Sequence, residues 1–299
     1  MPLVAQRRTP ELRRCWLFVP GAERAALVGA AKTGADVIIQ ELEDFTPPER
    51  RAHARALAAE IYPLWRKAGA LAAVRVNPLA GDGRADLGEV MRARPDIVLL
   101  PKVAEPAQVV ELEREVAGLE RAYGIPEGST ELAPNIESAR GVMQTYAIAK
   151  ASPRVVAVLG SSEDMAADLN AVRAQDGLEL AYVRARFHLE CRAAGTVAVD
   201  CPYTFGDLKG LAADTRYARR LGYLAKSAVR LGHVATINRL LTPSIAEIRA
   251  AKAIVAAFEK ARARGQANVR LGARLVELPI YLNAIRLLGR ARSLGEPGV

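Results

Sequence analysis

The sequence predicts an α/β protein built as a closed (β/α)8 barrel, and three observations support this. Short apolar runs alternate with helical segments eight times between Cys15 and Val229. The runs are almost continuously apolar, as in parallel strands that are buried on both faces. The chain has 299 residues, more than the roughly 250 that such a barrel needs. An open doubly wound sheet is the alternative, but the GxGxxG turn expected after its first strand is missing.

The eight strands are expected where the apolar runs lie. Turn residues close several of them, such as Pro20-Gly21 after the first run and Asn77-Pro78 after the third. The predicted strands are 15–19, 37–42, 72–76, 96–100, 131–136, 155–159, 196–199 and 223–229.

Helices are expected between the strands, because these segments alternate apolar and charged faces and end at glycine or begin at proline. The main predicted helices are 23–33, 48–65, 87–92, 106–123, 178–194, 208–221, 244–264 and 278–294, with a loop or extended piece at 265–276. We assign residues 1–240 to the barrel and 241–299 to a C-terminal helical extension. This extension is too short for a good core of its own, so it should pack on the barrel or on a neighbouring subunit.

Composition excludes several classes of protein. Hydrophobic residues make up 51% of the chain and charged residues 25%, which is typical of a globular protein. No apolar run reaches the roughly 18 residues of a membrane span, and the N-terminus lacks the apolar stretch of a secretory signal. The three cysteines show no CxxC spacing. We therefore expect a cytoplasmic protein with reduced, buried thiols.

The formal net charge of +9 could indicate a nucleic-acid partner. The arginines, however, are scattered over many segments, and no nucleic-acid-binding motif accompanies them. We expect no nucleic acid and no membrane as partners. A small anionic ligand is the expected partner instead.

Charged residues recur where the predicted strands end, which in a barrel is where chemistry takes place. Glu137 and Asp164 follow consecutive strands, so their carboxylates should lie side by side. Two such carboxylates without histidine or cysteine suit Mg²⁺, which prefers oxygen ligands and keeps several waters. The whole predicted ring is Glu43, Asp44, Arg75, Lys102, Glu137, Glu163, Asp164, Asp200 and Lys226.

This ring predicts a specific chemistry. Arg75 offers a planar fork for a substrate carboxylate. A 2-oxo or 3-hydroxy acid would be bound by the metal and clamped by Arg75. The metal would polarise the carbonyl and stabilise the enolate left after carbon–carbon cleavage. Asp168 lies four residues after Asp164 on a predicted helix and is expected to support the site without binding the metal.

Six segments carry motifs that are specific in combination. In chain order they read RCWLFVPG, ADVIIQELED, VRVNP, LLPKV, NIESARG and SSEDMAADL. Over roughly residues 13–240 the chain thus resembles the citrate lyase beta-subunit-like family, the CoA-ester lyase branch of the HpcH/HpaI aldolases. The resemblance implies a Mg²⁺-binding barrel that assembles as a homotrimer or homohexamer. It also implies cleavage or formation of acyl-CoA thioesters of malyl, citramalyl or citryl type.

The resemblance assigns roles to individual residues. It implies that Glu137 of NIESARG and Asp164 of SSEDMAADL hold the metal. Arg75 of VRVNP would bind the substrate carboxylate. Glu137 would contribute to substrate binding through the metal that it holds. The acidic pair Glu43 and Asp44 would support catalysis through Arg75 and a water on the metal.

Further candidates lie outside this group. Lys102 of LLPKV and Arg14 of RCWLFVPG are candidates for substrate binding, although Lys102 could equally form a plain ion pair. Glu277 in the tail stands where the family has an aspartate that closes over a neighbouring active site, and is a candidate general acid or base. The chain also departs from the family at Glu41, where many members have aspartate, and at 229–233, where an IHPSQ-like segment is replaced.

The sequence therefore predicts a Mg²⁺-dependent carbon–carbon lyase that acts on a 3-hydroxyacyl-CoA thioester. Three alternatives remain open at this stage. The barrel could be an aldolase on free 2-oxo acids, a malyl-CoA-type thioesterase, or a non-catalytic barrel that binds an acidic metabolite.

Overall fold

The computed structural model describes residues 8–297 and confirms the (β/α)8 barrel with a helical extension. Strands β1 to β8 pair in sequence order, every pair is parallel, and β8 closes on β1. This closure excludes the open doubly wound sheet. Part of the N-terminal segment in which we expect no secretory signal lies outside the described residues.

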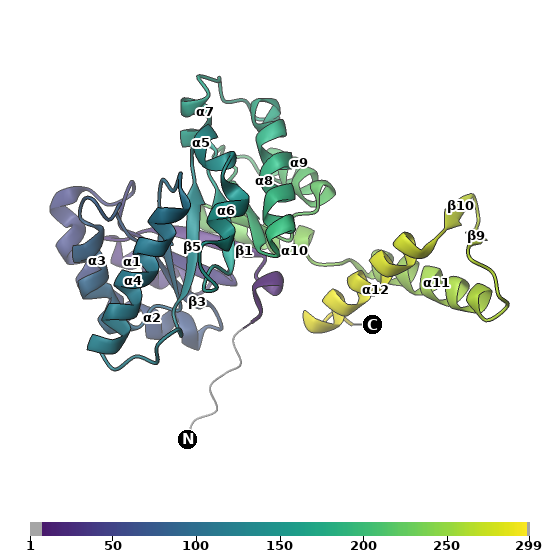
Figure 1. Ribbon diagram of the computed structural model, residues 1–299, viewed down its shortest axis with the longest axis horizontal. Coiled ribbons are helices and arrows are strands. Elements are labelled where there is room, and N and C mark those ends of the chain that lie inside the picture. Colours follow the sequence, from purple (N-terminus) through teal and green to yellow (C-terminus); the bar gives the residue numbers. More distant parts are fainter. Residues whose placement is uncertain (1–7, 298–299) are drawn as a thin grey trace. The chain divides into compact units, whose positions relative to one another are not determined.

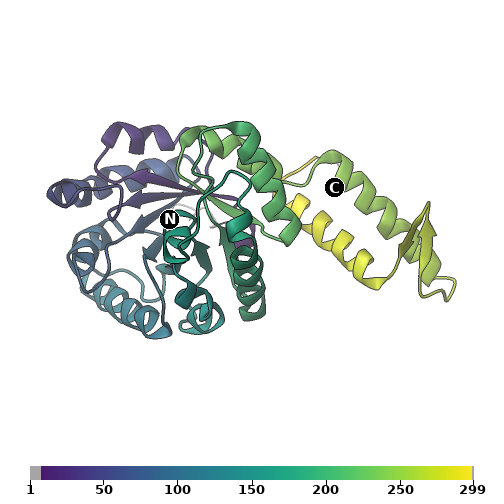
Figure 2. The ribbon, with the colours of Figure 1, turned by 90° about the horizontal axis from the view of Figure 1, so that it is seen from above.

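The barrel strands lie close to their predicted positions, and Figure 2 shows helices ringing them. The strands are β1 (Cys15–Pro20), β2 (Val37–Glu41), β3 (Leu71–Arg75), β4 (Ile97–Leu100), β5 (Glu131–Ile136), β6 (Ala157–Gly160), β7 (Val197–Asp200) and β8 (Ala225–Ala228).

The helices of the barrel differ in length, and three short ones follow β5 and β6 (Figure 1). They are α1 (Arg24–Ala30), α2 (Arg51–Lys67), α3 (Gly83–Val90), α4 (Pro106–Ala122), α5 (Ala139–Val142), α6 (Thr145–Lys150), α7 (Glu163–Asp168), α8 (Ala181–Ala194), α9 (Leu208–Leu221) and α10 (Val234–Leu241).

The chain divides into two compact units, Met1–Arg239 and Leu240–Val299. The second unit contains α11 (Ile245–Arg262) and α12 (Leu278–Ser293), whose aromatic rings Phe258 and Tyr281 stack with centroids 4.7 Å apart. Between these helices, the segment expected as a loop or extended piece forms a hairpin of β9 (Val269–Leu271) and β10 (Arg274–Val276). None of the described helices combines the length and the apolar character that crossing a membrane requires.

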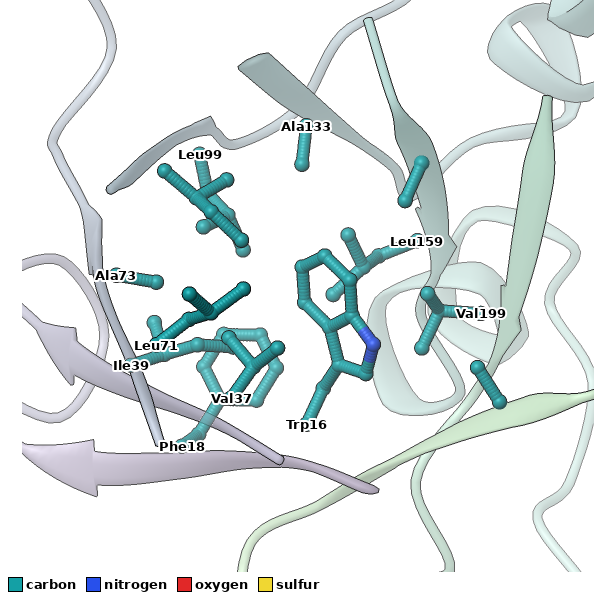
Figure 3. Packing of buried hydrophobic residues seen from close by; sticks show 13 residues of the cluster. Trp16, Phe18, Val37, Ile39, Leu71, Ala73, Leu99, Ala133, Leu159 and Val199 are labelled. Carbon is teal, nitrogen blue, oxygen red and sulfur yellow. The ribbon is translucent and has the colours of Figure 1, made fainter. Parts of the chain in front are cut away.

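Alternate residues of the strands fill the interior of the barrel, as the period of two in a β-strand requires. Figure 3 shows this core, in which Trp16 and Phe18 of β1 meet side chains from the other strands. The side chains that point into the core include Val37 and Ile39 from β2, Leu71 and Ala73 from β3, and Ala133 from β5. The residue two positions further along each strand points the same way.

This alternation decides which charged strand residues face the interior. Continuing the inward series places Glu41, Arg75 and Asn135 above the apolar core, at the C-terminal ends of β2, β3 and β5. Asp200 and Lys226, in contrast, each follow an inward core residue and point outward. The prediction that Asp200 and Lys226 belong to the charged mouth is therefore wrong.

The outward-facing pair forms a buried ion network between the barrel wall and the surrounding helices. Lys226 Nζ lies 2.6 Å from a carboxylate oxygen of Asp200 and 2.6 Å from one of Asp214. Arg184 of α8 binds the same two carboxylates, each at 2.7 Å. Burial alone would lower the pKa of Lys226, but the charges of Asp200 and Asp214 raise it. Two cations thus balance two carboxylates.

Replacing Lys226 by methionine removes one charge of this balanced set. We expect the Lys226→Met variant to lose about 3–5 kcal/mol of stability, because an unbalanced buried charge remains. The measurement is the midpoint of urea unfolding followed by circular dichroism. Arg24→Met, which breaks the exposed Arg24–Glu60 pair, should leave the midpoint nearly unchanged. Equal midpoints for the two variants would contradict the structural role of the network.

Candidate active site

A cavity of about 240 Å³ opens at the C-terminal ends of the barrel strands. Residues from β1, β2, β3, β5, β6, β7 and β8, or from the loops after them, line it. They are Phe18, Asp44, Phe45, Arg75, Asn135, Gly160, Ser161, Ser162, Glu163, Asp164, Pro202, Thr204 and Val229. The chemistry predicted for strand ends therefore has a site in which to take place.

Arg75 is the central cation of this cavity. It ends β3, points inward, and lies over the Phe18 ring at 5.1 Å from the centroid, a cation–π contact. Carboxylate oxygens of Glu41, Asp44, Glu43 and Glu137 lie 2.9, 3.1, 3.5 and 3.6 Å from its guanidinium nitrogens. One buried guanidinium is therefore shared by four carboxylates.

Glu41 holds this cation in place, and its role was missed by the sequence analysis. Its side chain is fully buried and accepts hydrogen bonds from Arg75 Nε at 2.9 Å, from the Glu43 amide at 2.7 Å and from the Phe45 amide at 2.5 Å. It therefore fixes both the guanidinium and the turn that carries Glu43 and Asp44. The available signal was a glutamate at an inward position of a strand.

The turn after β2 is held from two further sides. A Cβ on Gly21 would lie 2.4 Å from the Glu41 carbonyl oxygen, so only glycine permits this approach of β1 and β2. Asn77 Nδ2 donates to the Leu42 carbonyl at 2.9 Å. The PG and NP turns of the sequence motifs thus position the acidic turn.

Glu137 is the least satisfied charged group in the site. It follows β5 and is 4% exposed, and both of its carboxylate oxygens lack a hydrogen-bond partner among the described residues. Burial raises the pKa of Glu137 to about 7; Arg75 opposes this shift, while Asp164 and Glu43 add to it. A buried carboxylate whose oxygens accept no hydrogen bond is suited to binding a cation.

Asp164 lies in the first turn of α7 and lines the same cavity. Its Oδ2 accepts a hydrogen bond from Ser161 Oγ at 2.7 Å. Asp168, at the other end of α7, accepts from the Ala139 amide at 2.7 Å, two residues after Glu137. Asp168 thus braces the segment that carries Glu137, in line with the support role expected for it.

The donor set fits a hard divalent cation. Glu137 and Asp164 interact through their charges. Asp164 lines the cavity, and Glu137 lies buried beside the cavity residue Arg75, 3.6 Å from its guanidinium. Within residues 8–297, no group of three or more histidine, cysteine, aspartate or glutamate side chains could hold a metal. Two protein carboxylates, with water and substrate completing the shell, is the ligand set that Mg²⁺ commonly uses.

Glu43 and Lys102 form an ion pair at the edge of the site. Lys102 Nζ also lies 3.5 Å from Asp44. Burial raises the pKa of Glu43, although Arg75 and Lys102 oppose the shift. Lys102 has a φ of 53°, which is uncommon for a residue other than glycine and recurs at functional sites. Lys102 is therefore at the mouth, but already paired.

One predicted substrate-binding residue, Arg14, lies at the opposite end of the barrel from the cavity. Arg14 precedes β1 and binds Asp36, which precedes β2, at 3.0 Å. Both lie at the N-terminal ends of the strands, opposite the cavity, so the prediction that Arg14 contacts substrate there is wrong. Glu277 is exposed and is the N-cap residue of α12 in the second unit. Its general acid or base role stays a prediction.

Asn135 and Phe18 were also missed. Asn135 faces the cavity from β5, is 4% exposed, and its Oδ1 has no hydrogen-bond partner among the described residues. Phe18 provides the aromatic surface beneath Arg75. Counting inward positions along the predicted strands would have found both.

The model of the family described as HpcH/HpaI aldolase/citrate lyase matches residues 14–230. The chain belongs to this family. The match confirms the predicted family and the prediction of a lyase-type enzyme, and the barrel is the fold of its structural neighbours.

Relatives of the chain span nearly its whole length. It is 32% identical over 284 residues to the citrate lyase subunit beta of Leuconostoc mesenteroides subsp. cremoris, covering 94% of each chain. It is 31% identical over 283 residues to a (3S)-malyl-CoA thioesterase of Cereibacter sphaeroides, covering 94% of this chain and 95% of that one. Protein CitE of Mycobacterium tuberculosis, solved with magnesium, acetoacetate and coenzyme A, is 25% identical with a TM-score of 0.77, covering 93% of this chain and 98% of that one.

Changing Glu41 to glutamine tests how the site is held together. Glutamine has the same shape but lacks the charge and brings an NH₂ group to a place where three donors converge. We expect Glu41→Gln to lose about 1.5–3 kcal/mol of stability, the usual contribution of a hydrogen bond to a charged group. Thermal unfolding measures the loss. Glu60→Gln, at an exposed ion pair, is the control, and an equal melting temperature for both variants would contradict the role of Glu41.

Proposed function

We propose that the protein is a Mg²⁺-dependent carbon–carbon lyase that cleaves or forms a 3-hydroxyacyl-CoA thioester of the malyl, citramalyl or citryl type. The observation that carries this proposal is Glu137, a buried carboxylate that accepts no hydrogen bond from a described residue and interacts electrostatically with Asp164 and Arg75. The family match and the magnesium and coenzyme A in a solved relative support it.

The residues of the chain divide the work of this reaction. Glu137 and Asp164 would hold Mg²⁺, which supplies Lewis acidity at the oxo-acid carbonyl. Arg75 would bind the substrate carboxylate through Nη1, which makes no hydrogen bond to a described residue. Glu41, with Glu43 and Asp44, keeps the guanidinium oriented for that contact.

Lys102 and the tail complete the proposal. Because Lys102 lies at the mouth, it is placed to meet an anionic part of the substrate if its pairing with Glu43 and Asp44 loosens. Glu277 would exchange a proton with the enolate from an adjacent subunit. Its unit exposes apolar side chains at Leu278, Leu282 and Ile285, which supports packing of the extension on the barrel or a neighbour in a homotrimer or homohexamer.

The cellular location is a further part of the proposal. Cys15, Cys191 and Cys201 are free and buried. Reduced thiols fit the cytoplasm that we propose for the protein.

A thioesterase is the second candidate function, because a relative of that name matches as fully as the citrate lyase subunits do. A panel of malyl-, citramalyl- and citryl-CoA with free hydroxy acids, assayed with Mg²⁺ or EDTA, separates the candidates. Metal-dependent glyoxylate, pyruvate or oxaloacetate indicates the lyase. Free thiol without a carbonyl product indicates the thioesterase, and no product at all would favour a binding protein.

Removing either proposed metal ligand should abolish binding and turnover together. We expect Glu137→Ala and Asp164→Ala to show no Mg²⁺ heat in calorimetry and no cleavage activity, because each variant loses one of the two protein carboxylates proposed to hold the ion. Glu179→Gln, which lies outside the cavity and pairs with Arg173, is the matched control and should retain binding. Turnover in either alanine variant would contradict the assignment of Glu137 and Asp164 as metal ligands.

Magnesium affinity should depend on pH through Glu137. Its pKa is raised from 4.5 to about 7 in the folded, metal-free protein, so the ionised form is disfavoured and stability from this group falls as pH rises from 4.5 to about 7. Mg²⁺ needs the ionised form, and its affinity should therefore rise with pH up to about 7 and then level off. We expect the Kd for Mg²⁺ to be roughly tenfold larger at pH 6 than at pH 8. Calorimetry at both values measures this, and an unchanged Kd would show that no proton is released.

A further inference from the structure

The cavity holds few positive charges for an enzyme of anionic substrates. Among the described residues that line it, Arg75 is the only cation, while Asp44, Glu163 and Asp164 are acidic. The nearby cations are engaged elsewhere. Lys102 pairs with Glu43 and Asp44, and Arg173 pairs with Glu163 and Glu179.

Arg75 itself has capacity for one more carboxylate. Its Nε donates to Glu41 at 2.9 Å and its Nη2 to Asp44 at 3.1 Å. Its Nη1 makes no hydrogen bond within the described part of the chain, and the Glu137 oxygen near it is 3.6 Å away. One guanidinium nitrogen is therefore left for a ligand, and it can engage a single carboxylate group.

The rest of the lining is apolar or neutral. Phe18, Phe45 and Val229 contribute hydrocarbon, and Asn135 contributes an uncharged amide. The volume of about 240 Å³ is below the roughly 300–1,000 Å³ of pockets for drug-sized ligands. The cavity is thus suited to the oxo-acid part of the substrate and not to the coenzyme.

We infer that this cavity selects an oxo acid with one carboxylate and a hydrogen or small apolar substituent, of the glyoxylate or pyruvate kind, over a dicarboxylic oxo acid. The inference rests on the proposed function and narrows it to malyl- or citramalyl-type thioesters. A second carboxylate would enter a lining whose other charges, on Asp44, Glu163 and Asp164, are negative, while the nearby cations are already paired with protein carboxylates. Such like-charge contacts are strongly unfavourable in a partly dehydrated site.

The test uses the full chain with Mg²⁺ and compares kcat/KM for malyl-CoA and citramalyl-CoA with that for citryl-CoA. We expect the better of the first two to exceed citryl-CoA by at least about 100-fold, given the effect of an unpaired buried charge. Calorimetry with the free oxo acids provides a second readout that needs no turnover. With Mg²⁺ present, pyruvate or glyoxylate should bind at least about tenfold more tightly than oxaloacetate.

A charge added to the lining should shift this preference. Phe45 is 40% exposed, so Phe45→Arg adds a cation with little effect on the core. We expect it to reduce the preference for the monocarboxylate by at least tenfold in both measurements. Phe45→Leu, which removes the ring without adding charge, is the matched control and should keep the preference.

The outcomes separate this inference from the proposed function. Cleavage of citryl-CoA as fast as citramalyl-CoA, or equal binding of oxaloacetate and pyruvate, overturns the inference and leaves the lyase standing. Preferred binding of pyruvate or glyoxylate without cleavage of any thioester supports the inference and overturns the lyase. Absence of both binding and cleavage overturns both.

Discussion

The charge balance around Arg75 is the constraint on which the candidate site depends. Glu41, Glu43, Asp44 and Glu137 share this one guanidinium, and Asp164 adds its negative charge to Glu137. Among residues 8–297, Lys102 is the other cation in contact with this group, and it pairs with Glu43 and Asp44. The described site is thus more negative than its own cations can balance. A bound divalent cation would offset more of this excess negative charge than protonation of Glu137 alone does.

The barrel and the rim on which the proposed metal ligands lie could be predicted from the sequence because both depend on local order along the chain. Apolar runs, their spacing and the residues after them placed Arg75, Glu137 and Asp164 correctly at one end of the barrel. Asp200 and Lys226 satisfied the same rule and still face outward. A position at the end of a strand tells at which end of the barrel a residue lies. Whether its side chain points into the barrel or outward depends on whether it is an even or an odd number of residues from a core residue of the same strand. That parity required knowing which residues of β7 and β8 pack inside.

Other features depended on three-dimensional contacts with no local signal. Arg14 belongs to a specific motif, but the motif begins before its strand, and the side chain therefore lies near Asp36 at the other rim. Glu41 was treated as a departure from a family pattern, while its three hydrogen bonds make it the support of the acidic turn. The helices of the tail follow from periodicity. The surface against which these helices pack cannot be predicted in the same way, because an amphipathic helix requires an apolar partner but does not specify which one.

The ion network outside β7 and β8 also helps to determine the register in which these two strands pair. If either strand slipped by one residue, Asp200 or Lys226 would replace Val199 or Ala225 in the apolar interior, without a counter-charge. The observed register places both charges among Arg184 and Asp214, whereas a register shifted by one residue buries an ion without its partners. These four side chains therefore favour one register of β7 and β8, the last strands of the barrel in chain order. They penalise misaligned closures more than they favour the aligned one.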